Sequence, residues 1–203
     1  MPYVLTVDQI SSRSGPDLVE PTLRRLSVDT VLGFARTVGD EFQGVLTDPV
    51  SVVRAILDLM RDGGWHIGLG IGAIETPLPD EPRQARGPAF TAARDAVEAA
   101  KRESDHVRFA AEPAAEQETA DAETVLHLLA ALRERRSDQG WEAIDAMADG
   151  ATMQQAAERL GISRQAVGQR LRAAHWAVER DAVPVLARLL HRAEAATGAG
   201  SAS

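Results

Sequence analysis

One acidic, alanine-rich segment divides this sequence into two parts with different patterns. Residues 111–123 carry five acidic side chains, no basic side chain and no large apolar residue. This composition is typical of a linker or of the loosely packed start of a helix. The whole chain has 203 residues, which is enough for two small domains. We therefore predict a domain over 1–110, a linker over 111–123, a helical domain over 124–196 and a disordered tail over 197–203.

The composition excludes several classes of protein. The chain has no cysteine, which rules out a disulfide scaffold and thiolate metal sites. No apolar run approaches the roughly 18 residues that a membrane helix needs, and the N-terminus lacks the basic start and apolar run of a signal peptide. We expect a cytoplasmic protein with no membrane contact.

The first part of the chain alternates between strand and helix patterns in the order β-α-β-β-α-β-α-β. The stretch 65–75, "WHIGLGIGAIE", is a glycine-rich strand, and its missing side chains indicate that another backbone approaches it closely. The order predicts an α+β fold class with a ferredoxin-like core, extended by one helix and one strand. The second part of the chain predicts only helices.

Arginine is concentrated where the helices are predicted. Although the net charge of the chain is −8, residues 124–203 carry ten basic and nine acidic side chains, and all ten bases are arginine. Arginine is the side chain best suited to bidentate contacts with phosphate and guanine. A DNA-binding face depends on local charge, so the acidic total does not exclude one.

The run "MQQAAERLGISRQAVGQRLRAA", 153–174, has the features of a helix-turn-helix at the expected offsets. Ala156 and Ala157 are small where two helices must cross closely, and Gly161 suits a tight turn. Val167 and Leu171, four residues apart, anchor the second helix to a core. The run also resembles region 4 of sigma factors and the LuxR-like helix-turn-helix, which implies that its second half is the recognition helix.

The side chains left on or near the outward side of that helix suit base edges and phosphates. They are Ser163, Arg164, Gln165, Gln169, Arg170 and Arg172. We expect double-stranded DNA as the partner and a homodimer as the binding species. The alternative interpretation is a helical hairpin with an ordinary polar face, used for structure or for contact with a protein.

The stretch "TVGDEFQGVL", 37–46, places a glycine and two acids between two strand-like runs. In the predicted fold the first strand lies beside this hairpin, so the carboxylates of Asp8 and Asp40 could converge. Two such carboxylates with a backbone carbonyl would make an oxygen site for Mg²⁺. Glu41 is expected near the same cleft, and Arg13 offers a contact to phosphate.

"VGDEFQGVL", together with "VDQISSR", "IGLGIGAIE" and "GPAFTAARDAVEAAK", resembles the SatD family of bacterial proteins over most of residues 3–110. "GDEF" at a hairpin tip more distantly resembles the GGDEF diguanylate cyclases and the class III nucleotidyl cyclases, which share a palm fold. That resemblance implies a palm domain in which Asp8 and Asp40 hold the metal. It also implies that Lys101 contacts phosphate.

The chain departs from the cyclase signature in two places. Val38 replaces the first glycine, and the first-strand motif Asp-x-Asp-x-Phe-Lys is reduced to the single acid Asp8. Our first hypothesis is therefore a DNA-binding transcriptional regulator whose N-terminal domain senses a ligand, such as a nucleotide with Mg²⁺, or mediates dimerisation. The alternatives are a nucleotidyl-cyclase-like enzyme with a DNA-binding appendage and a scaffold that contacts RNA polymerase.

Three other features are expected to be structural. The five histidines are scattered without the spacing of metal ligands. The run "LRERR", 132–136, predicts a solvated helix face, with contact to the DNA backbone as the alternative. The run "PVLARLLHRAEAA", 184–196, suits either a dimerisation helix or a cover for the helix-turn-helix core.

Overall fold

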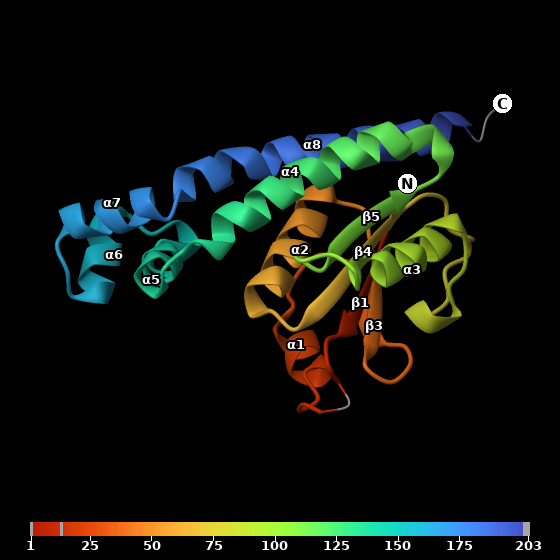
Figure 1. The fold of residues 1–203 in the computed structure, drawn as a ribbon, viewed down its shortest axis with the longest axis horizontal. Coiled ribbons are helices and arrows are strands. Elements are labelled where there is room, and N and C mark those ends of the chain that lie inside the picture. Colours follow the sequence, from red (N-terminus) through yellow and green to blue (C-terminus); the bar gives the residue numbers. More distant parts are fainter. Residues whose placement is uncertain (1, 13, 201–203) are drawn as a thin grey trace. The chain divides into compact units, whose positions relative to one another are not determined.

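The computed structural model describes residues 2–12 and 14–200. These residues form a mixed α/β protein with a five-stranded sheet and eight α-helices. The chain separates into two compact units (Figure 1): unit 1 comprises 1–124 and 185–203, and unit 2 comprises 125–184. Among the described helices, none is both long and apolar enough to cross a membrane.

The sheet of unit 1 has the strand order β2-β3-β1-β4-β5. The strands are β1 (Tyr3–Gln9), β2 (Leu32–Arg36), β3 (Glu41–Leu46), β4 (Trp65–Ile71) and β5 (Val107–Ala111). Strand β1 pairs antiparallel with both β3 and β4, β2 pairs antiparallel with β3, and β5 is parallel to β4. Helices α1 (Val19–Arg25), α2 (Pro49–Asp62) and α3 (Pro88–Ala100) complete the predicted element order, which is confirmed.

Helix α3 lies directly on β4 because two glycines of that strand have no side chains. A Cβ atom on Gly70 would stand 2.0 Å from the Ala89 carbonyl oxygen and 2.4 Å from the Ala93 nitrogen. A Cβ atom on Gly68 would stand 2.3 Å from the nitrogen of Val97. The glycine-rich sequence of β4 predicted the close approach of another backbone, and that backbone is the one of α3.

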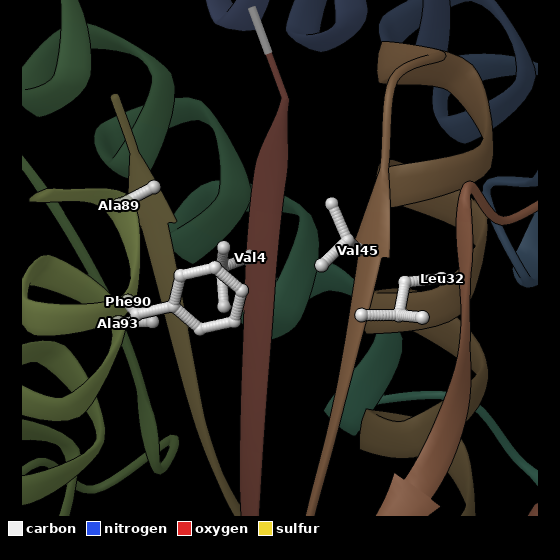
Figure 2. Packing of buried hydrophobic residues seen from close by; sticks show 6 residues of the cluster. All are labelled: Val4, Leu32, Val45, Ala89, Phe90 and Ala93. Carbon is white, nitrogen blue, oxygen red and sulfur yellow. The ribbon is translucent and has the colours of Figure 1, made fainter. Parts of the chain in front are cut away.

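Helices α2 and α3 cover opposite faces of the sheet (Figures 1 and 2). Asp48 caps the start of α2 by accepting bonds from the backbone N–H groups of Val50 and Ser51. On the α3 face, one cluster of buried apolar side chains joins the helix to three strands (Figure 2). Its members are Val4, Leu32, Val45, Ala89, Phe90 and Ala93.

The expected linker is ordered and belongs largely to unit 1. It contains the 3₁₀ helix η2 (Pro113–Ala115) and the start of α4 (Glu116–Glu134). Glu123 of α4 accepts the backbone N–H of Phe109 at 2.5 Å and also pairs with Arg108. This contact satisfies a donor of the edge strand β5, which explains why an acidic segment is held in place.

The C-terminal part of α8 (Trp176–Gly200) also belongs to unit 1, in contrast to the predicted helical domain over 124–196. Leu186, Leu190 and Ala193 are completely buried, and the Tyr3 hydroxyl donates to Glu194 at 3.1 Å. Residues 197–200, which the sequence suggested as part of a disordered tail, continue α8, and Thr197 is buried. Residues 201–203 lie outside the described residues.

Unit 2 is helical. It contains the end of α4, α5 (Asp138–Ala146), the 3₁₀ helix η3 (Ala148–Gly150), α6 (Met153–Leu160), α7 (Arg164–Ala173) and the start of α8. Its small core is formed by buried residues of α5, α6 and α7. They are Ala143, Ala146, Ala156, Ala157, Val167 and Leu171.

The prediction that 132–136 is a solvated helix face is wrong for two of its arginines. Arg133 and Arg136 are buried, and Glu179 of α8 forms ion pairs with both. Arg136 also donates to the Ala174 carbonyl at 2.8 Å, and both guanidinium groups stack on the ring of Trp141. Buried charges must be paired, and this network supplies the partners that a sequence pattern cannot reveal.

Gly70→Ala tests the contact between α3 and β4. The new methyl group would overlap the α3 backbone, so we expect the free energy of unfolding to fall by about 3 kcal/mol or more, the upper end for overpacking. Gly33→Ala is the matched control because a Cβ atom there meets nothing within 4 Å. Urea unfolding followed by circular dichroism compares the two, and equal midpoints would contradict the contact.

Candidate functional site

Asp8 lies near the end of β1, where its neighbours on both sides are polar. In the sheet register Asp8 is paired with Glu41 of β3 and with His66 of β4. Directly paired residues project from the same face of a sheet. The carboxylates of Asp8 and Glu41 and the imidazole of His66 therefore share the face on which α3 lies.

Lys101 follows the last residue of α3 and reaches Asp8. Its Nζ atom lies 3.3 Å from Oδ2 of Asp8 and 2.7 Å from Oε1 of Glu98. The hydrogen bond that Lys101 donates to Glu98 is the largest cause that raises the pKa of Lys101, and the charge of Asp8 acts in the same direction. The side chain of Asp8 is only 18% exposed, so the ammonium group is held beside a mostly buried carboxylate.

The hairpin tip that contains Asp40 contacts the end of β1 through the backbone. The N–H of Gln9 donates to the Asp40 carbonyl at 3.2 Å, and Gly39 takes a left-handed conformation with φ of 61°. Glu41 accepts a hydrogen bond from the Thr37 hydroxyl at 2.5 Å. Val38 is 79% exposed at the tip.

The Mg²⁺ site expected at Asp8 and Asp40 stays a prediction, and the surroundings of Asp8 weigh against it. Among the described residues, no three His, Asp or Glu side chains are arranged to hold a metal ion. The Asp8 carboxylate is engaged by Lys101 instead. Arg13, the expected phosphate contact, lies outside the described residues.

Two of the five histidines, although far apart in the sequence, lie beside this site. The rings of His66 and His106 are edge to face with centroids 4.9 Å apart, and neither buried Nδ1 atom has a hydrogen-bond partner among the described residues. Burial, followed by the neighbouring His106, lowers the pKa of His66. Only the parallel register of β4 and β5, which pairs Ile67 with Val107, brings the two rings together.

A pocket of about 360 Å³ lies elsewhere in unit 1, between α1 and α2. It is lined by both signs of charge, and Arg25 forms an ion pair with Asp62. None of the described residues that were predicted to bind a ligand lines this pocket. The lining residues are Thr22, Arg25, Leu26, Asp58, Arg61 and Asp62.

In unit 2, α6 and α7 are joined by a tight turn at 161–163. A capping box of Thr152 and Gln155 begins α6, and Gly161 ends it with φ of 65° and ψ of 30°. The Ser163 hydroxyl caps α7 by accepting the N–H of Ala166 at 3.1 Å. The predicted role of Gly161 in the turn is confirmed.

The core side of α7 is also as predicted, with Val167 and Leu171 buried against α5 and α6. Gly168 is buried on this side, where a Cβ atom would stand 3.0 Å from the terminal methyl carbon of Met153 in α6. The glycine therefore serves contact with the neighbouring helix.

Most of the residues predicted to contact DNA point away from this core, and Arg164, three residues before Val167, is exposed in the first turn of the helix. Arg170 is half-buried, and its guanidinium donates to Glu142 of α5 at 3.1 Å. The other five residues are exposed. They are Ser163, Arg164, Gln165, Gln169 and Arg172.

The depressed pKa of His66 predicts a pH dependence of stability. Because the folded pKa lies below the ordinary value of 6.5, the unfolded chain binds more protons in the interval between them, and stability falls as the pH drops below about 6.5. His66→Gln removes this contribution of the histidine. The free energy of unfolding of the variant should therefore fall less than that of the wild-type protein between pH 7.5 and 5. Urea unfolding at several pH values measures how the free energy of unfolding of each protein changes with pH. The same change in both proteins would contradict a depressed pKa at His66.

Comparison with known proteins supplies no relative from which a role could be transferred. No protein-family model, no curated protein and no solved structure matches the chain. Any functional assignment therefore rests on the residues and their geometry.

Proposed function

We propose that this protein is a DNA-binding transcriptional regulator in which α6 and α7 form a helix-turn-helix and α7 enters the major groove. The observation that carries the proposal is the division of α7 into two sides. Val167, Gly168 and Leu171 face the core, while the two glutamines and Arg172 are exposed on the other side and Arg164 is exposed in the first turn.

The chemistry of the exposed side matches what DNA presents. The N-terminal residues of a recognition helix contact base edges, which gives this role to Arg164 and Gln165. Arginine pairs with guanine and glutamine with adenine, while Arg172 in the last turn suits a phosphate oxygen. Arg170 is held by Glu142, so its proposed role is limited to a contact at the edge of the interface.

For unit 1 we propose a ferredoxin-like, palm-type fold. The first six elements follow the order β-α-β-β-α-β, and β1 lies between β3 and β4 in an antiparallel core. Helix α3 then adds β5 in parallel. This arrangement is what supports the proposed palm-type fold.

The proposed role of unit 1 is to sense a ligand or to hold two copies of the chain together. A homodimer would present two α7 helices to half-sites about one DNA turn apart, roughly 34–36 Å, and would select a nearly palindromic operator. A ligand would regulate such a dimer only by binding two arrangements with different affinities.

A nucleotidyl-cyclase-like enzyme is the second candidate. The observation that favours it is the contact between the "GDEF" hairpin tip and the end of β1, close to Asp8. It predicts a cyclic or linked nucleotide product from ATP or GTP with Mg²⁺ or Mn²⁺, lost in Asp40→Ala. The engagement of Asp8 by Lys101 weighs against it.

Substitutions on α7 test the regulator. Arg164→Ala removes an exposed side chain, so folding should be unchanged. We expect affinity for DNA from upstream of its own gene to fall about 10- to 100-fold, the usual cost of about 1–3 kcal/mol for a base contact. Fluorescence anisotropy with labelled DNA measures the loss.

Two further variants give the experiment its controls. Arg172→Ala should weaken binding to all sequences and reduce the salt slope by about one. Arg188→Ala removes an exposed arginine of α8 in unit 1 and should leave affinity unchanged. If the wild-type protein and the three variants bind this DNA with equal affinity, α7 has no role in DNA binding. That result would favour a scaffold that contacts another protein.

A further inference from the structure

The ammonium group of Lys101 in unit 1 lies between two carboxylates. Lys101 Nζ is 3.3 Å from Asp8 and 2.7 Å from Glu98. Asp8 and Glu98 together carry two negative charges, and the ammonium group neutralises one of them. Asp8 therefore has a positive partner supplied by the chain itself.

The position of this cation is fixed by packing. Lys101 directly follows α3, and α3 is seated on β4 through the contacts of Gly68 and Gly70 with its backbone. Asp8 is held in the middle strand of the sheet by pairing on both sides. Both ends of the ion pair are thus anchored in packed elements of the same unit.

The surrounding acids do not complete a metal site. Mg²⁺ in proteins is usually held by one or two carboxylates, and waters or phosphate oxygens complete its octahedral shell, so the state of Asp8 and of the acids near it is decisive. Glu41 is engaged by the Thr37 hydroxyl, and the first strand offers Ile10 where the cyclase motif has its second acid. A divalent cation at Asp8 would also be repelled by the ammonium group within a few ångströms.

We propose that Lys101 is an internal counter-ion that takes the place of a divalent cation at Asp8, so that unit 1 works without metal. The proposal goes beyond DNA binding and does not depend on it. It means that any ligand of unit 1 is bound without a bridging metal ion. It also means that Asp8 is a latent metal ligand, masked by one side chain.

Binding of Mn²⁺, followed by the electron paramagnetic resonance signal of the free ion, tests the proposal. The wild-type protein should bind Mn²⁺ weakly, and Lys101→Met should bind it at least about tenfold more tightly. Asp8→Asn added to Lys101→Met should abolish the gain. Arg102→Met is the matched control, since it removes the adjacent exposed positive charge and should bind like the wild-type protein.

Two results would overturn the proposal. One is tight Mn²⁺ binding by the wild-type protein, equal to that of Lys101→Met. The other is a folded Lys101 variant with no gain in binding. Circular dichroism establishes folding, and Lys101→Gln, which keeps a polar end, provides the measurement if Lys101→Met does not fold.

Discussion

The structure of unit 1 depends on the contact between the backbones of α3 and β4. Gly68 and Gly70 let the helix approach so closely that any side chain there would overlap the helix backbone. Interiors are packed densely and cannot absorb such an overlap without movement of the helix. The contact sets the height of α3 above the sheet, and with it the place of Lys101 at the end of the helix.

That placement connects the fold to the proposed functions. Lys101 is brought to Asp8, beside the pair of His66 and His106, and the site becomes a charge-compensated cluster. Unit 2 differs from unit 1 in that a few small apolar residues form its core. There Arg133 and Arg136 are buried against Trp141 and Glu179. Helices α4 and α8 carry the chain from one unit to the other and back.

Features with local causes could be predicted from the sequence, and features that need distant partners could not. The order of strands and helices follows from local periodicity, and so do the core positions Val167 and Leu171. The cap at Ser163 follows from its residue type. The ion pair of Lys101 and Asp8 joins residues 93 positions apart, and the histidine pair depends on the register of β4 and β5. The ordering of 111–123 depends on Glu123 meeting an edge strand.

Specific DNA binding is the central claim, and an anisotropy titration of the wild-type protein tests it most directly. The labelled DNA comes from upstream of its own gene, with unlabelled nonspecific DNA as competitor, at two salt concentrations. A regulator should prefer its site by about a thousandfold or more over the competitor. Weak binding that only falls with salt, or no binding, would contradict the account.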